Sequence, residues 1–270
     1  MQKLLDEFDI ILLGIGSGVS TSAGYEYSGE GVREDFKAFI EKFKTDNIYE
    51  MGFFPFEDEA EYWGYFSKLI YKNRYTPPKK DTYKNLAELL KKKEYFILTT
   101  NVDHALFLDG LDEEKIFEYQ GDFGKDQCGI PCTKKLYDNR DSILKMIENI
   151  ENTKVREDLI PVCPICGNYM MPNIRVDERF VEDENWHRKN KKLEEFVEKN
   201  KNKKVLLLEM GVGYNTPGII KYRFWKYAKE NPGFHYAVVN KEKSYIPEKI
   251  KHKSYEFIGD IDEIIRLYFF

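Results

Sequence analysis

Residues 8–18 read FDIILLGIGSG, an apolar run that ends in glycines. Near-continuous apolar runs stopped by glycine are typical of strands that are buried on both faces of a parallel sheet. Similar runs lie at residues 95–100, 204–210 and 234–240, and a shorter one lies at 257–259. Helical patterns separate these runs, so we predict an α/β fold with a parallel sheet and helices on both of its faces.

A glycine-rich loop follows the first predicted strand. Gly16, Ser17 and Gly18 would let the backbone come close to a diphosphate, and a helix that starts there would offer N–H donors and a favourable dipole. The preceding strand favours a nucleotide site, although a plain strand-to-helix turn remains the alternative. No acidic residue stands out about 20 residues further on, where common dinucleotide folds hold the ribose. The loop therefore does not indicate an ordinary hydride-transfer dehydrogenase.

Composition argues against several classes of protein. The 270 residues are 42% hydrophobic and 33% charged, which is enough apolar material to close a core. The 42 basic and 47 acidic residues give a net charge of -5, which argues against a general nucleic-acid binder. Apolar runs are far shorter than the roughly 20 residues of a membrane span, and the N-terminus lacks a secretory signal pattern. We expect a cytoplasmic protein with no nucleic-acid or membrane partner, in which cysteines are not paired as disulfides.

The four cysteines form two closely spaced pairs, Cys128-x3-Cys132 and Cys163-x2-Cys166. Two such pairs can bring four thiolates to tetrahedral positions around zinc and leave no coordination position open for water. A metal held in this way stabilises a small module and does not catalyse. We therefore expect a structural zinc site.

Two stretches interrupt the alternation of strands and helices. Residues 31–80 are rich in aromatic side chains and have helical patterns, and residues 121–202 contain the cysteines. We expect the first stretch to be a helical insertion and the second to be a zinc-binding small module. The sheet domain would then consist of residues 1–30, 81–120 and 203–270.

A polar motif follows the second predicted strand at residues 99–103. Ligands of open parallel sheets bind outside the carboxyl ends of the strands. Asn101 and Asp103 could hydrogen-bond sugar hydroxyls and a carboxamide there, or could simply cap a helix. The residues alone leave both interpretations open. We expect His104 to be a packed or capping histidine rather than a catalyst.

In this order, the motifs resemble those of the sirtuin family. The sirtuin G-A-G-x-S loop is matched at residues 16–20, and the T-Q-N-x-D motif is matched at 99–103. The four-cysteine module, a G-T-S-like turn at 211–213 and Asn240 after a late strand follow in the same order. The resemblance covers nearly the whole chain, and it implies a Rossmann-like NAD-binding domain, NAD as a co-substrate and structural zinc.

Two departures are similar to one branch of that family, the macrodomain-linked sirtuins of microbes. Residues 25–29 replace the usual P-D-F-R motif, and Gln120-Gly121 replaces the catalytic H-G pair. Residues 208–217, LEMGVGYNTP, also look like this branch. The resemblance implies mono-ADP-ribosylation of a protein, with a lipoylated carrier protein as the acceptor. It also implies a functional partnership with a macrodomain protein that removes ADP-ribosyl groups.

The resemblance implies catalytic roles for Asn101 and Gln120. The residues that it implies for NAD binding are Gly16, Ser17, Gly18, Ser20, Gly24, Tyr25, Tyr27, Thr100, Asn101, Asp103, Gln120, Gly211, Gly213, Asn215, Asn240 and Ile261.

The exchange of histidine for glutamine at position 120 has a chemical consequence. Imidazole titrates near pH 6.5 and can act as a general base, whereas an amide can hold a hydroxyl group but cannot remove its proton. Loss of a general base costs about 10²–10⁴-fold in rate, so deacylation should be slow or absent. Cleavage of the nicotinamide–ribose bond needs mainly orientation and electrostatic stabilisation. An acceptor carboxylate is already ionised, so transfer of ADP-ribose fits Gln120 better than deacylation does.

Other activities remain as alternatives. An NAD-dependent protein deacylase, a non-catalytic module that binds NAD or ADP-ribose, and an NAD hydrolase would use the same fold. Asn101 and Asp103 argue against a pure binding module, which would not need this pair. The aromatic residues at 49–75 could form a lid over the cofactor or a core, and we favour the core.

Overall fold

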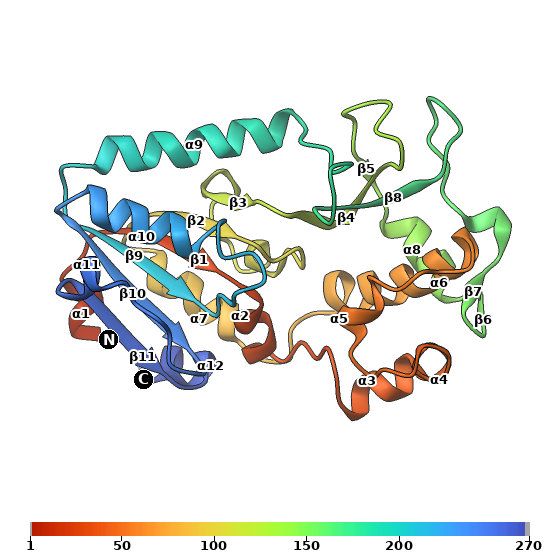
Figure 1. The fold of residues 1–270 in the computed structure, drawn as a ribbon, viewed down its shortest axis with the longest axis horizontal. Coiled ribbons are helices and arrows are strands. Elements are labelled where there is room, and N and C mark those ends of the chain that lie inside the picture. Colours follow the sequence, from red (N-terminus) through yellow and green to blue (C-terminus); the bar gives the residue numbers. More distant parts are fainter. Residues whose placement is uncertain (1, 268–270) are drawn as a thin grey trace.

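A computed structural model describes residues 2–267, and its largest sheet has six strands (Figure 1). The strand order is β11-β10-β9-β1-β2-β3, and all neighbouring strands are parallel. The strands are β1 (Ile10–Ile15), β2 (Glu94–Thr99), β3 (Ile116–Glu118), β9 (Val205–Met210), β10 (Phe234–Asn240) and β11 (Ser254–Ile258). The predicted parallel sheet is confirmed. The sequence pattern missed β3, which has only three residues, and it captured only the end of β11.

Helices cover both faces of this sheet, as predicted. Because side chains alternate along a strand, Ile11 and Leu13 of β1 enter one apolar core whereas Ile10 and Leu12 enter the other. The helices over the first core are α1 (Gln2–Asp6), α2 (Ser17–Ser22), α7 (Thr82–Leu90) and α12 (Ile261–Arg266). Those over the second core are α9 (Glu184–Asn200), α10 (Lys221–Glu230) and α11 (Glu248–Lys251).

The central strands end at the same level of the sheet. Ile15, the last residue of β1, is in register with Thr99 of β2 and with Met210 of β9. The loops that follow these three strands therefore start side by side at one edge of the sheet. This edge holds the glycine loop and the polar motif of residues 99–103.

A second part of the molecule, on the right in Figure 1, combines two segments that are distant in sequence. Its helices are α3 (Glu30–Asp35), α4 (Lys37–Phe43), α5 (Ile48–Met51), α6 (Glu59–Ile70), the π-helical turn η1 (Tyr71–Tyr75) and α8 (Arg140–Ile147). Its strands are β4 (Gly121–Cys128), β5 (Tyr137–Asp138) and β8 (Met170–Ile174) in one antiparallel sheet, and β6 (Ile150–Glu151) and β7 (Lys154–Val155) in a hairpin. Short 3-10 turns complete the chain at η2 (Ala105–Phe107), η3 (Glu113–Lys115) and η4 (Glu157–Leu159).

One apolar core joins the two segments of this second part. Trp63 and Tyr65 of α6 are fully buried in the same cluster as Ile143 of α8. The aromatic side chains of α6 therefore pack in a core, which was the favoured interpretation. Tyr49 and Phe53, by contrast, are exposed.

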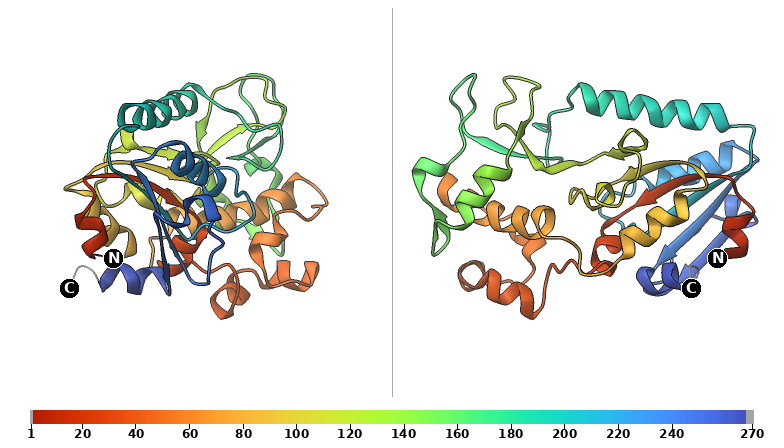
Figure 2. Two further views of the ribbon diagram at one scale, coloured as in Figure 1. Left: turned by 60° about the vertical axis from the view of Figure 1, so that its left-hand side comes forward. Right: turned by 180° about the vertical axis from the view of Figure 1, so that it is seen from behind.

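Helix α9 lies within the range 121–202 that we assigned from sequence to the zinc module, but it packs on the six-stranded sheet (Figure 2). Leu193 is fully buried in the second core of the sheet, and the ring of Phe196 lies 5.8 Å from the ring of Phe96. The apolar side of α9 thus belongs to the core of the six-stranded sheet. None of the helices among residues 2–267 is long and apolar enough to cross a bilayer.

Candidate functional site

The glycine loop after β1 packs against the loop after β9, backbone against backbone. The N–H of Gly18 donates to the carbonyl of Gly211 at 3.0 Å. A Cβ atom on Gly16 would lie 2.5 Å from the Gly211 oxygen, and one on Gly18 would lie 2.7 Å from the Gly211 Cα. Gly211 has a φ of +63°, which also favours glycine. Close packing of the two loops thus requires these glycines independently of any ligand.

A buried hydrogen-bond network ties the polar motif after β2 to helix α2. The amide of Asn101 donates to the Gly16 carbonyl at 3.2 Å and to the Ser20 Oγ at 2.8 Å. The Ser20 hydroxyl donates to the Asp103 Oδ2 at 2.5 Å, and the Tyr83 hydroxyl lies 2.9 Å from the Ser20 Oγ. Both amide hydrogens of Asn101 are therefore directed at protein acceptors, and its side chain is fixed at the edge of the sheet.

Burial raises the pKa of Asp103, although hydrogen bonds from Ser20 and from the N–H of Ala105 oppose this effect. The second of these bonds, at 3.0 Å, holds the start of η2. Asp103 thus has the local capping role that the sequence left open, and it also belongs to the network around Ser20. Asn101 caps nothing in this network and instead joins two loops.

Gln120 lies in the turn between β3 and β4, and its backbone is held on both sides. The Gln120 carbonyl accepts a 2.9 Å hydrogen bond from the N–H of Arg175, and the Tyr119 carbonyl accepts one of 3.0 Å from the indole of Trp186. Gly121 has a φ of +96°, and a Cβ atom there would lie 2.0 Å from the Asn173 oxygen. Only glycine can follow Gln120 in this turn, so the position of Gln120 is set by packing.

The other residues expected to bind NAD fall into two groups. The amide of Asn240 donates to the Val212 carbonyl at 3.3 Å, and the N–H of Thr100 donates to the Ile15 carbonyl at 3.0 Å, so both join the same edge. Tyr25 is buried in the first core, and Tyr27 packs against it. In contrast, Ser17, Gly213 and Asn215 are exposed, Gly24 packs against Lys79, and the side chain of Ile261 is buried in the core under the sheet.

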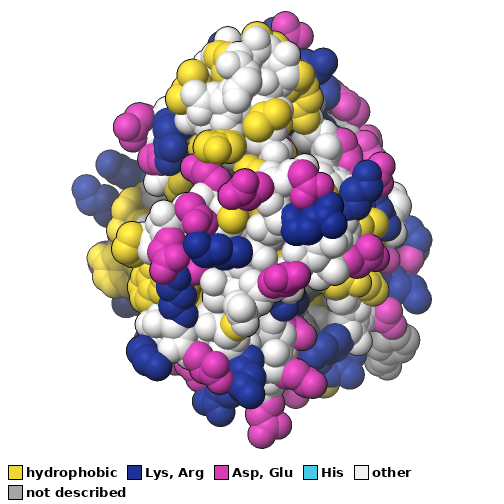
Figure 3. Space-filling model, turned by 90° about the vertical axis from the view of Figure 1, so that its right-hand side faces the viewer, with side chains coloured by type: hydrophobic (Ala, Val, Ile, Leu, Met, Phe, Trp, Pro, Cys, Tyr) yellow, Lys and Arg dark blue, Asp and Glu magenta, His cyan; other side chains and the backbone are white. Residues whose placement is uncertain are grey.

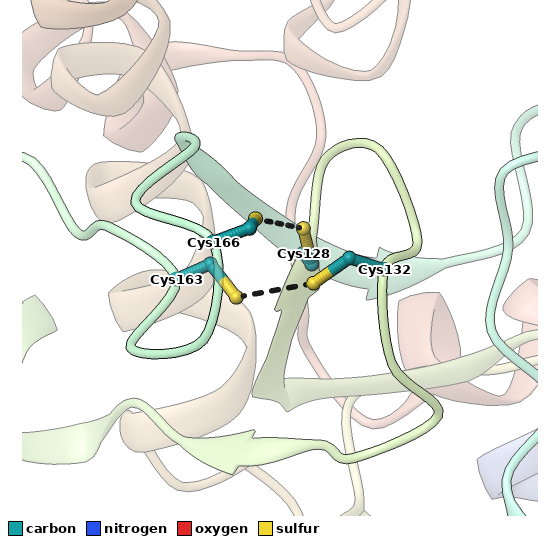
Figure 4. A group of neighbouring side chains, drawn as sticks. All are labelled: Cys128, Cys132, Cys163 and Cys166. Carbon is teal, nitrogen blue, oxygen red and sulfur yellow. Dashed lines mark hydrogen bonds between the residues drawn. The ribbon is translucent and has the colours of Figure 1, made fainter.

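The four cysteines converge from β4, the loop after it and a tight turn before β8 (Figure 4). The Sγ atoms of Cys128 and Cys166 are 3.6 Å apart, as are those of Cys132 and Cys163. These distances exceed the S–S bond of a disulfide, about 2.0 Å, and are close to the roughly 3.8 Å edge of a tetrahedron of sulfurs around zinc. The donor set thus fits a structural zinc ion. Figure 3 shows this end of the molecule, where apolar side chains are exposed between charged ones.

A charged cluster that we did not predict lies beside the Gln120 turn. His104 has a φ of +61°, and its ring stacks on Phe107 at 3.9 Å, so it is a packed residue, as expected, although its side chain forms no capping hydrogen bond. Its Nδ1 atom lies 3.4 Å from the Glu118 Oε1 and 3.6 Å from the Asp122 Oδ2. The Asp122 carboxylate in turn accepts a 2.8 Å hydrogen bond from Arg74. The sequence signal for this cluster is the pair of acidic residues two positions before and after Gln120.

The ionisation of this cluster differs from that of free side chains. Burial raises the pKa of Glu118 to about 7, and the neighbouring charge of Asp122 acts in the same direction. Burial lowers the pKa of His104, but its close contact with Glu118 and the charges of Glu118 and Asp122 outweigh burial and raise it above the ordinary value. A cavity of about 450 Å³ is lined by His104, Glu118 and Asp122 and therefore connects the cluster to solvent.

Comparisons with known proteins agree on fold and activity, although no family model matches the chain. The chain is 34% identical over 266 residues to a protein ADP-ribosyltransferase of Staphylococcus aureus (strain Mu50 / ATCC 700699), covering 98% of this chain and 84% of the relative. It is 26% identical over 243 residues to a probable bifunctional ADP-ribose hydrolase/ADP-ribosyltransferase of Fusarium oxysporum f. sp. cubense. This second match covers 82% of the chain but only 38% of the fungal protein.

Solved structures of Sir2 enzymes share the fold. A Sir2 structure described in a study of mechanism and regulation matches with a TM-score of 0.62 at 17% identity, covering 99% of this chain and 94% of that one. A Sir2 complex with a p53 peptide and NAD+ matches with a TM-score of 0.54 at 18% identity, covering 98% and 94%. At these identities the likeness establishes the fold alone.

Proposed function

Because the chain belongs to the sirtuin-type protein ADP-ribosyltransferases, which are NAD-dependent enzymes, we propose that it transfers one ADP-ribosyl group from NAD to a protein acceptor and releases nicotinamide. The single observation that carries this proposal is the Asn101 network. Asn101, Ser20 and Asp103 are buried and are joined by hydrogen bonds. They lie at the carboxyl edge of the sheet, where ligands of such folds bind. A rigid set of this kind can orient a ribose without rearranging.

The role of Gln120 follows from its chemistry and its fixed backbone. When NAD is bound, it supplies an ADP-ribosyl group whose bond to nicotinamide can be broken. The Gln120 amide would hold a ribose hydroxyl by hydrogen bonds, but it has no proton-accepting group in the physiological range. The attacking group must therefore bring its own negative charge, as a carboxylate does. This reasoning favours transfer to an acidic side chain over deacylation.

The acceptor that we propose is a lipoylated carrier protein, as the resemblance to macrodomain-linked sirtuins implies. We also propose a functional partnership with a macrodomain protein that removes ADP-ribosyl groups. This partnership rests on that resemblance. The fungal relative is named a probable bifunctional ADP-ribose hydrolase/ADP-ribosyltransferase, and this chain matches 38% of it. The two activities would then add and remove the same modification.

We further propose that the four cysteines bind one structural zinc ion and that the helical insertion at 31–80 and residues 121–202, apart from helix α9 on the sheet, fold around it as a small module. Two Sγ distances of 3.6 Å support the ligand set, and all four sulfurs lie within 4.8 Å of one another, as ligands of one ion must. With four thiolates as ligands the ion has no free position, so its role would be to stabilise the module that presents β4 and the Gln120 turn.

The proposed transfer is tested by incubation of the protein with labelled NAD and a carrier protein, either lipoylated or unmodified, followed by mass spectrometry of the labelled species. We expect label on the carrier and loss of labelling in Asn101→Ala. Asn149→Ala is the matched control, because this amide lies beside α8 and donates only to a backbone carbonyl of that helix. Transfer that survives Asn101→Ala contradicts the assignment. Release of O-acyl-ADP-ribose from an acylated peptide would favour the deacylase alternative.

A further inference from the structure

Four charged side chains from separate elements meet beside the Gln120 turn. His104 directly precedes η2, Glu118 ends β3, Asp122 lies on β4 and Arg74 lies in η1. Arg74 is paired directly with Asp122, whereas His104 faces both carboxylates through one nitrogen. With both acids ionised and His104 protonated, the formal charge of the cluster is zero. Loss of the imidazole proton leaves one net negative charge.

The sequence positions of the two acids tie this charge to the proposed site. Gln120 is the middle residue between Glu118 and Asp122, and a chain advances at most about 7 Å over two residues. Both carboxylates face the same imidazole nitrogen although the turn separates them. The backbone of Gln120 is therefore close to that of both acids, in surroundings where burial weakens dielectric screening, so a group held by Gln120 would feel the charge of the cluster.

The groups around His104 and Glu118 account for the unusual ionisation of the pair. Asp103 and Asp122 disfavour the charged form of Glu118, and His104 favours it. Arg74 opposes protonation of His104, but the two carboxylates favour it more strongly. The other charged groups that line the cavity are Glu113, Lys125, Asp183 and the ion-paired set of Glu114, Arg188 and Lys189. These groups lie across a space that is connected to solvent. The charged neighbours on η1, β4 and the loop after β2 therefore have the larger effect on the pKa values of His104 and Glu118.

We propose that His104 and Glu118 form a proton-holding pair that sets the charge beside Gln120, and that ADP-ribosyl transfer is fast only while Glu118 is ionised. This inference rests on the proposed transfer reaction at Gln120. As the bond from ribose to nicotinamide breaks, positive charge moves onto the ribose, and a nearby carboxylate stabilises it. Glu118 supplies that carboxylate, and the positive charge of His104 favours its ionised form. Both are positioning residues, since neither has to touch the substrate.

The first test needs no substrate. The chain has four histidines, so each imidazole can be followed by NMR as a function of pH, and His104→Asn identifies the signal of His104. Asparagine is the suitable replacement because it tolerates the left-handed backbone of this position. We expect Glu118→Gln to lower the titration midpoint of His104 by about one pH unit, because it removes the carboxylate that favours the imidazolium. Glu113→Gln, which alters a carboxyl on the same cavity but outside the cluster, should leave the midpoint unchanged.

The second test is the pH dependence of nicotinamide release and of transfer to the lipoylated carrier. Wild-type rates should rise with pH through a limb near the pKa of Glu118, about 7. Glu118→Gln should remove the limb and lower the plateau roughly tenfold. His104→Asn should move the limb to higher pH because the imidazolium that favours the carboxylate is gone. Asp122→Asn should move it to lower pH because a like charge is gone.

The outcomes separate this inference from the function on which it rests. If Glu118→Gln leaves the titration midpoint of His104 unchanged, His104 and Glu118 do not form a proton-holding pair, whatever the activity of the variant. If the rise of the rate with pH persists in Glu118→Gln, the ionisation of Glu118 does not control the rate. Absence of both transfer and nicotinamide release by the wild type at every pH overturns the proposed function, and the NMR titration then still decides whether the pair exists.

Discussion

Asn101 donates a 2.8 Å hydrogen bond to the hydroxyl of Ser20, and that hydroxyl donates in turn to Asp103. One buried oxygen thus links the loop after β2 to the helix after β1. Ser20→Ala leaves the amide and the carboxylate without this partner, and we expect it to lower the free energy of unfolding by about 1–3 kcal/mol. Urea denaturation measures this loss. Thr21→Ala, one residue further along on the exposed side, is the control. Equal stabilities for the two variants would contradict the role of Ser20.

The contact between the glycine loops gives a second prediction with a matched control. A Cβ atom on Gly16 would lie 2.5 Å from the Gly211 oxygen, whereas one on Gly213 meets nothing within 4 Å. Gly16→Ala should therefore destabilise the fold by about 1–3 kcal/mol and weaken NAD binding, because it pushes the two loops apart. Gly213→Ala should leave the stability unchanged. Calorimetric titration with NAD and thermal melting of both variants check this, and a stable Gly16→Ala variant with normal NAD binding would refute it.

The same glycines show how far the sequence alone could lead. The apolar runs that became β1, β2, β9 and β10 were identified because each is long, buried on both faces and stopped by polar residues or glycine. The cysteines were identified because two closely spaced pairs are typical of the ligands of a zinc ion. Strand β3 was missed because three residues carry no periodic pattern. From the sequence, the glycines of the loop after β1 favour a nucleotide site. In the structure, close packing on Gly211 is by itself sufficient to require Gly16 and Gly18.

The charged cluster could not be predicted from local sequence for a different reason. His104 faces Glu118 and Asp122 because its own backbone and that of Gly121 both adopt positive φ angles. Such angles redirect the chain in a way that strand and helix patterns do not reveal. Arg74 reaches Asp122 from a π-helical turn 48 positions away in sequence. Tertiary packing, and not spacing, brings these groups together.

The chemistry of position 120 predicts a gain of activity. Gln120→His introduces an imidazole that can act as a general base, so we expect deacylation of an acylated peptide to rise at least about tenfold above the wild-type rate. Release of O-acyl-ADP-ribose provides the measurement. Gln120→Asn is the control, because it changes the side chain without adding a base. Efficient deacylation by the wild-type protein would show that the amide is not the limiting feature.

Removal of zinc should unfold the small module. The four thiolates would hold the ion with no other ligand, and structural zinc commonly contributes on the order of 10 kcal/mol of folding free energy. We expect about one zinc per chain by elemental analysis and a large fall in melting temperature with strong chelator, reversed by zinc but not by magnesium. Cys166→Ser should reproduce the loss. A metal-free protein that melts at the same temperature as the untreated one would exclude a structural ion.

A buried ion pair lies under the loop after β9, and its contribution to the stability of the fold can be measured. Lys221, at the start of α10, and Glu209, in β9, are both fully buried and bonded to each other, and the hydroxyl of Tyr236 donates to the second Glu209 oxygen at 2.8 Å. Lys221→Met leaves a carboxylate in a buried site without its cation, which typically costs about 3–5 kcal/mol. Adding Glu209→Gln removes the stranded charge and keeps the hydrogen bond from Tyr236, so the double variant should regain most of the lost stability. Urea unfolding of the three proteins measures this recovery. If the second substitution lowers stability further instead, the two side chains act independently, and the cost of Lys221→Met is a packing defect rather than an unpaired charge.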